Sequence, residues 1–357
     1  MMDSHVSQIT KGKIRSLPLD LWPEADRNAW ISGCRPAARL KRGGAAGHLK
    51  PITRDDLARR YGYFLDFLSR RGLLQIGTLA ATCVTLENVE TYIAELKQRV
   101  GSVTLYGSIH KLRHAAEIIA PSLEFAWLGE LEKDLALDMR PRSKFDRIVL
   151  IEVLVEAALT LIHEAETSPN LSSLARARQV RNGLMVALLG MCPIRLKNFA
   201  ALEIGRSFVE IKSRWWIVLA ASETKENRPD ERLIDELLKP VIDRYLNQHR
   251  PVLARTDKPV SALWLSSNDG APMSYAGVED VIKATTLSTV GIDVSPHLFR
   301  ACGASTAATY GGNNPHLTSA LLDHTDASVT NAHYNRATSL TAADRLQQIV
   351  RQCEKND

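Results

Sequence analysis

The sequence lacks the marks of secreted, membrane-spanning and disulfide-stabilised proteins. No apolar run comes near the roughly 20 residues that a membrane-spanning helix needs, and no apolar signal-peptide core is present, so we expect no membrane partner and no secretion. Cysteine is rare, with five scattered residues and no C-x-x-C spacing. These absences exclude a disulfide framework and a cysteine zinc site, and they indicate a cytoplasmic protein with reduced thiols.

Metal-ligand spacing is also missing from the C-terminal histidines. His316, His324 and His333 include no i, i+4 pair and have no carboxylate partner at a matching spacing. Helical metal sites depend on that pattern. We therefore expect no metal.

Acidic residues are scarce at the N-terminal end of the chain. Residues 1–72 hold 14 Lys and Arg against 7 Asp and Glu, whereas all 357 residues carry a formal net charge of +5. The basic excess thus lies entirely in this first fifth. It indicates a polyanionic partner or, equally, a solvated basic face.

Residues 1–48 are predicted to be an N-terminal arm or extension. Trp22 and Trp30 could anchor a short helix within it. A group of cations precedes a flexible Gly-Gly pair, so the arm could become ordered on DNA or on a partner subunit, and a disordered tail is an equal alternative. These cations are Arg35, Arg39, Lys41 and Arg42.

Apolar residues recur at helical spacing through residues 49–137, which predicts a compact helical domain. Residues 138–146 (DMRPRSKFD) are basic, contain proline and have little apolar content, so they read as an interdomain linker. The predicted helices begin at Ile52 and then cover Leu86–Val100, Leu105–Ala120 and Phe125–Leu137.

The next predicted domain, residues 147–340, mixes helices with strands. The fold class is therefore mainly α with a small antiparallel β-sheet, in which a helical domain precedes a mixed α+β domain. The predicted helices include Ile148–Ala165, Leu171–Met191 and Asp235–Gln248, and the predicted strands are Ser207–Ile211, Trp215–Ala221 and Glu231–Ile234.

The stretch Ser295–Ala337 concentrates groups that could act on a phosphodiester. It opens on a Ser-Pro pair, which starts a helix, so His297 and Arg300 project from one face of its first turn. His324 ends the next predicted helix, and Tyr334 follows on a third. A tyrosine oxygen has a pKa of roughly 10, so it needs basic or cationic neighbours to act as a nucleophile.

The order His-x-x-Arg, then His, then Tyr resembles that of the tyrosine recombinases, the phage-integrase-like site-specific DNA recombinases. That family also carries an earlier arginine after an apolar helix and a lysine on a β-hairpin. Arg195 matches the first in CPIRLKNFAAL, and Lys225 matches the second in the loop SETKENRPD, where Arg228 is the rival. The resemblance covers residues 50–340.

Three positions depart from the family pattern. Asn198 stands where many members carry an acidic residue that supports the active site. Ala301 stands where a histidine is frequent, and Asp323 stands where glycine is common. None of these positions supplies a catalytic group, so the resemblance still implies activity. Taken singly, His297 could cap its helix, His324 could complement a helix dipole, and Tyr334 could be a core residue.

The resemblance implies a metal-free phosphoryl transfer without a cofactor. A tyrosine attacks the scissile phosphate, which gives a 3′-phosphotyrosyl link and a free 5′-hydroxyl. Two arginines hold the non-bridging oxygens and a lysine protonates the leaving oxygen, while one histidine serves as base or proton partner and another donates to the phosphate. In that order the residues are Tyr334 (nucleophile), Arg195 and Arg300, Lys225, His297 and His324.

The resemblance also implies partners. The helical domain and the linker would clamp a double-stranded DNA recombination site of a mobile genetic element. Strand exchange implies a homotetramer on DNA, located in the nucleoid. Other recombinases or directionality factors could take part as further partners. The predicted DNA contacts, for which a solvated face is the alternative, are Lys111, Arg113, Arg140, Arg142 and Lys144.

The last predicted segment, residues 341–357, is an amphipathic helix that could fold onto its own domain or onto a neighbouring subunit. Two other functions remain open. A type IB topoisomerase-like enzyme would use the same chemistry to relax DNA alone, and an accessory factor would bind DNA with an idle site.

Overall fold

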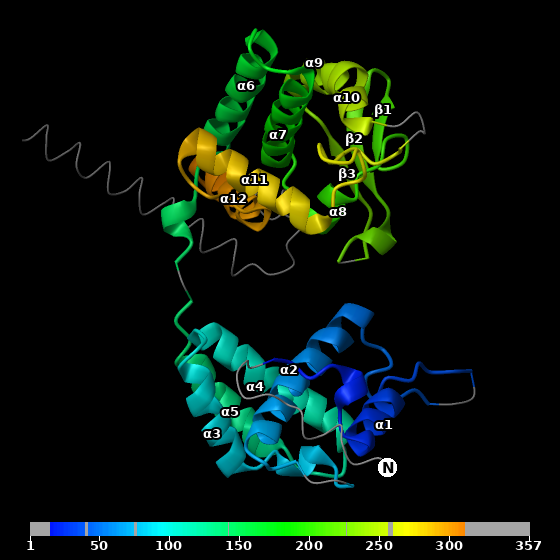
Figure 1. The fold of residues 1–357 in the computed structure, drawn as a ribbon, viewed down its shortest axis with the longest axis vertical. Coiled ribbons are helices and arrows are strands. Elements are labelled where there is room, and N and C mark those ends of the chain that lie inside the picture. The colour runs from blue at the N-terminus through cyan, green and yellow to red at the C-terminus, as the bar shows by residue number, and fades with distance from the viewer. Residues whose placement is uncertain are drawn as a thin grey trace, which may run out of the picture. The chain divides into compact units, whose positions relative to one another are not determined.

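A computed structural model describes residues 15–39, 42–74, 77–141, 143–225, 227–255 and 260–310. The chain divides into two compact units, Met1–Arg142 and Ser143–Asp357, and the division falls within the predicted linker at 138–146. The described part is mainly helical with one antiparallel sheet (Figure 1), which confirms the predicted fold class.

The regular elements in the described part of the first unit are helices and short 3₁₀ turns. Its helices begin where the sequence offers start signals: Pro51 lies in the first turn of α2, and the Thr85 side chain accepts the N–H of Asn88 at the start of α3. The elements are the 3₁₀ turns η1 (Leu19–Leu21) and η2 (Ala80–Cys83) and the helices α1 (Glu24–Gly33), α2 (Pro51–Arg70), α3 (Leu86–Lys97), α4 (Ser102–Ile119) and α5 (Ala126–Leu137).

Part of the segment predicted as an N-terminal arm packs into the core of this unit, while the boundary of the arm at residue 48 stays a prediction. Leu17, Trp22 and Trp30 are buried, and the Trp22 ring lies 5.0 Å from that of Tyr61 on α2. Burying two tryptophans against an apolar helix outweighs the freedom of a solvated arm. Residues 1–14 lie outside the described part.

The second unit surrounds a small sheet with helices. Its 3₁₀ turns are η3 (Phe145–Arg147), η4 (Ala221–Glu223) and η5 (Glu236–Leu238), and η6 (Tyr245–His249) is a π-helical turn. Its helices are α6 (Ile151–Thr167), α7 (Ser173–Met191), α8 (Leu196–Ala200), α9 (Lys239–Arg244), α10 (Arg250–Ala254), α11 (Tyr275–Val290) and α12 (Pro296–Tyr310), and its strands are β1 (Phe208–Ile211), β2 (Arg214–Leu219) and β3 (Asp230–Leu233).

Helix α7 runs through the core of the second unit beside α6 (Figure 1). The two helices approach closely because Gly183 has no side chain. A Cβ atom there would lie 2.6 Å from Cγ1 of Ile162 and 2.9 Å from the carbonyl oxygen of Ala158. This contact fixes the middle of α7 against α6, and the candidate site begins where α7 ends, at Met191.

The sheet has the order β1-β2-β3 with antiparallel pairing throughout. Lys212 and Ser213 join β1 to β2 with φ angles of 50° and 61°, the left-handed pair that suits a two-residue hairpin. Phe208 pairs with Ile217, and both are buried. The strands thus alternate buried and exposed residues close to the predicted positions. None of the described helices is long and apolar enough to cross a membrane.

Candidate active site

The turn between α7 and α8 positions the first candidate arginine. Helix α7 ends at Met191, and Pro193 follows where it cannot continue the helix. Ile194 is only 1% exposed, so the core anchors the turn. Arg195 then takes the N-cap position of α8 with an extended backbone (φ −66°, ψ 137°) and a half-buried side chain.

Arg300 reaches the same turn from α12. The carbonyl of Ser295 accepts the N–H of Leu298 over 2.7 Å, which starts α12 at the predicted place. Arg300 is 7% exposed, and its Nη1 donates to the carbonyl oxygen of Pro193 over 2.8 Å. A buried guanidinium requires acceptors for its N–H groups. Here the turn that carries Arg195 supplies one.

His297 lies one turn before Arg300 and keeps an exposed side chain. Its pKa is lowered below the ordinary value, first by partial desolvation and then by the positive charges of Lys144 and Arg300. Cations destabilise a protonated imidazole. His297 is therefore held in the neutral form, which can accept a proton.

Lys225 lies in the loop between β2 and β3, as the sequence predicts. The hydroxyl of Thr224 closes this loop, because it accepts the N–H of Arg228 over 3.1 Å and donates to the Arg228 carbonyl over 2.7 Å. Asn227 supplies the left-handed turn with a φ of 53°. Lys225 and Arg228 both have exposed side chains in this closed loop, so they remain alternatives for the cation of the hairpin.

Arg232 on β3 is a cation near the site that sequence reasoning missed. Its guanidinium is 12% exposed and binds both carboxylate oxygens of Asp230, over 2.9 and 3.0 Å. Burial raises the pKa of Cys192 to about 11, and the charge of Arg232 opposes that rise, which places Arg232 near the α7–α8 turn. Arg232 pairs across the sheet with the buried Ile217. This pairing places the Arg232 side chain on the same face of the sheet as buried Ile217. The pairing is the feature that would have identified Arg232 as a candidate.

The predicted DNA contacts on α4 are engaged in ion pairs within the first unit. Lys111 binds Asp56 on α2. The guanidinium of Arg113 binds Glu132 on α5 over 2.6 Å and Glu117 over 2.8 Å. These side chains connect helices of the unit, and contact with DNA would require them to exchange partners.

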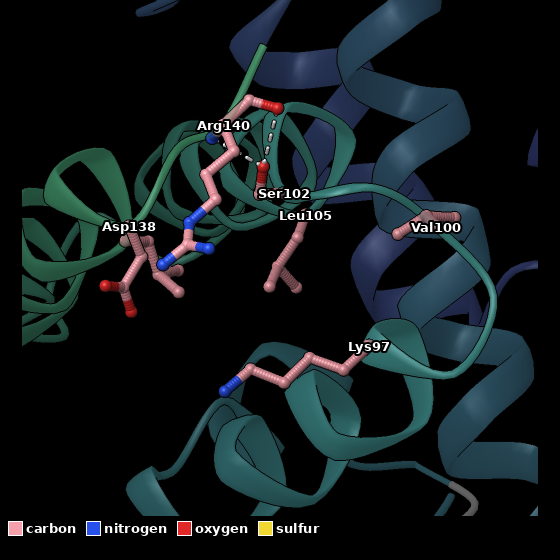
Figure 2. A pocket seen from close by; sticks show the side chains of 7 residues that line it. Lys97, Val100, Ser102, Leu105, Asp138 and Arg140 are labelled. Carbon is pink, nitrogen blue, oxygen red and sulfur yellow. Dashed lines mark hydrogen bonds between the residues drawn. The ribbon is translucent and has the colours of Figure 1, made fainter. Parts of the chain in front are cut away.

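The linker cations have different surroundings. The backbone N–H of Arg140 donates to the hydroxyl of Ser102 over 2.8 Å. Figure 2 shows its side chain lining a hollow together with Lys97 and Asp138. Lys144 belongs to the second unit, where its charge acts on His297. Arg142 lies outside the described residues.

Two of the six predicted catalytic residues, His324 and Tyr334, also lie outside the described residues, as does the predicted terminal helix at 341–357. Within the described ranges, no group of three or more His, Cys, Asp or Glu side chains is arranged to hold a metal ion. Of the six predicted catalytic residues, four are described. Arg195, His297 and Arg300 lie in one region, where Arg300 binds the turn that carries Arg195, and Lys225 lies in the loop between β2 and β3.

No protein-family model and no curated protein match the chain. Its structure is similar to the XerH site-specific recombinase bound to its difH substrate in a pre-cleavage complex, with a TM-score of 0.47, 11% identity, and coverage of 91% of this chain and 93% of that chain. It is similar to the XerA recombinase with a TM-score of 0.37, 16% identity, and coverage of 84% and 94%.

A lambda integrase fragment, residues 75–356, is similar with a TM-score of 0.41 and 14% identity, over 81% of this chain and 90% of that chain. It was solved as a dimer bound to a COC′ core site. Because the identities and scores are low, the function of this chain is inferred below from its own residues.

Proposed function

We propose that this chain is a site-specific DNA recombinase that cuts and rejoins strands through a covalent 3′-phosphotyrosyl intermediate. The observation that carries the proposal is the 2.8 Å hydrogen bond from buried Arg300 to the carbonyl of Pro193, in the turn that presents Arg195. Two guanidinium groups at one turn can bind the non-bridging oxygens of a phosphate. Those oxygens gain negative charge during in-line attack, so the arginines stabilise the transition state.

In the proposed step, the hydroxyl of Tyr334 loses its proton and its oxygen bonds to phosphorus. The bond from phosphorus to the 5′-oxygen breaks, and that oxygen leaves with a proton as a free hydroxyl. Reversal by the 5′-hydroxyl of another strand rejoins DNA without a high-energy cofactor, because the phosphotyrosine conserves the bond energy. No metal takes part in either direction.

The remaining side chains supply the protons. A neutral His297 is suited to take the tyrosine proton, and its lowered pKa favours that form. Lys225, on the closed β2–β3 loop, is proposed to protonate the leaving 5′-oxygen, with Arg228 as its alternative. His324 is proposed to donate to the phosphate.

The partner in this proposal is a double-stranded recombination site, bound by a homotetramer in the cytoplasm. Basic linker residues, including Arg140 and Lys144, would approach the DNA backbone. The exchange of strands would serve a mobile genetic element.

Covalent trapping tests the proposal. Wild-type protein and Tyr334→Phe are incubated without metal with nicked duplexes made from the sequences that flank the gene. We expect an SDS-resistant protein–DNA adduct from wild type only, since phenylalanine has no oxygen to attack phosphorus. Tyr334→Phe should bind the same duplexes as tightly as wild type.

Two outcomes would overturn the proposal. An adduct from Tyr334→Phe equal to that of wild type would show that another group is the nucleophile. DNA binding by wild type without an adduct on any flanking duplex would favour an accessory factor with an idle site.

A further inference from the structure

The segment from Arg27 to Arg54 carries positive charge only. It holds seven Lys and Arg and no Asp or Glu. Most of these cations fall between α1 and α2, in a connection that follows the C-terminal end of α1 at Gly33. Arg35, Arg39 and Arg42 of this connection have exposed side chains. We call these three residues the arginine loop.

The backbone holds the base of the arginine loop in a defined shape. Gly44 donates its N–H to the carbonyl of Arg35 over 2.9 Å, and Ala46 donates to the carbonyl of Gly33 over 2.8 Å. A Cβ atom at Gly44 would lie 2.2 Å from the oxygen of Gly33, so the two sides of the base touch. Arg54 on α2 also donates to the Cys34 carbonyl over 3.0 Å.

Within the described part of the chain, the members of the arginine loop have no acidic partner, in contrast to Arg59 and Arg70. Arg59 binds Asp56 over 2.6 Å, and Arg70 binds Glu95 over 2.7 Å. Among the described residues, no ion pair involves a member of the arginine loop. Holding like charges together in water is slightly unfavourable unless a polyanion binds them.

We propose that the arginine loop is a contact for the phosphate backbone of duplex DNA, separate from the linker and α4 residues. This inference rests on the proposed function. Arginine presents a planar fork that binds phosphate oxygens in pairs.

The test is the salt dependence of DNA binding. The full chain and the triple variant Arg35→Gln/Arg39→Gln/Arg42→Gln are titrated with the duplex that gives the covalent adduct, over a series of salt concentrations. Each lost phosphate contact should flatten the slope of log K against log salt by about 0.9, so three contacts give up to about 2.7. The affinity at low salt should fall in parallel.

Two matched variants isolate the cause. Arg35→Lys/Arg39→Lys/Arg42→Lys keeps the charges and should keep most of the slope. Arg59→Gln/Arg99→Gln/Lys133→Gln removes the same charge from residues that already have acidic partners, and it should change the slope less. Circular dichroism and thermal unfolding should be the same for all variants.

An unchanged slope and affinity in the glutamine variant would overturn the inference and leave the proposed function intact. Loss of binding to phosphatidylserine vesicles, with DNA binding unchanged, would overturn it in favour of a membrane contact. Failure of wild type to form any adduct would instead count against the proposed function.

Discussion

Asp26 and His297 show how surroundings assign different roles to single ionisable residues. Asp26 is fully buried and accepts hydrogen bonds from the hydroxyl of Tyr61 (2.5 Å) and the N–H groups of Ala80 (2.7 Å) and Ala81 (3.1 Å). Donors on every side make it a structural acceptor that ties α1, α2 and η2 together. His297 has cations around it instead, so its neutral form is favoured and it is suited to proton transfer.

Replacing Lys144 with glutamine should raise the pKa of His297 toward its ordinary value. Desolvation is the first cause of the lowered pKa, and the charges of Lys144 and Arg300 add to it. Removing one of those charges stabilises the protonated imidazole. An NMR titration of the histidines in the full chain measures the change.

The same variant should shift the pH dependence of adduct formation. Because neutral His297 is proposed to accept the tyrosine proton, the rate should fall as the pH drops through its pKa, and this fall should begin at a higher pH in Lys144→Gln. Lys212→Gln, which changes an exposed cation of the β1–β2 turn, is the control and should behave as wild type. A His297 pKa that stays constant or falls in Lys144→Gln would contradict the assignment.

At the scale of helices and strands, the sequence predicts an element correctly where apolar residues recur at the spacing of a strand or a helix. Trp215, Ile217 and Leu219 are buried at every second position of β2, and that alternation identifies a strand from sequence alone. The helix predicted over Asp235–Gln248 forms, and the structure resolves it into η5, α9 and the π-helical turn η6, followed by α10. Pro240 lies in the first turn of α9, where its missing N–H is tolerated.

The close approach of α6 and α7 predicts opposite effects on stability for two glycine-to-alanine substitutions. Gly183→Ala should lower the free energy of unfolding by about 1–3 kcal/mol, since its Cβ would meet Ile162 and the Ala158 backbone, and overpacked contacts cost that much. Gly107→Ala, inside α4 with no atom within 4 Å of the added Cβ, should raise it by about 1 kcal/mol through helix propensity.

Urea unfolding of the full chain, followed by far-ultraviolet circular dichroism, measures both effects. The two glycines lie in different units, so each substitution should move the transition of its own unit. Equal effects of the two substitutions would mean that α6 and α7 do not meet at Gly183.

At the scale of the whole molecule, the sequence predicts those site residues that the order of the motifs identifies. It does not predict residues whose role depends on contacts with residues far away in the sequence. Arg195 and Arg300 follow from motif order, and the hydrogen bond to Pro193 brings them to one turn. Arg232 could not be predicted without the strand register that opposes it to Ile217. The pairing of Arg113 with Glu132 is equally hidden, because Glu132 lies on another helix.

The proposed function also predicts how many chains act together. Two duplexes that exchange strands are cut at four positions, and each cut uses one tyrosine, so four chains of 39.6 kDa should assemble on two duplexes. Sedimentation velocity of Tyr334→Phe with duplexes carrying the recombination site measures this mass without covalent products. Wild type with the same DNA serves as the control. A stable complex of one chain on one duplex, combined with an adduct from wild type, would favour the topoisomerase-like alternative, because relaxing DNA requires a single tyrosine and no exchange between duplexes.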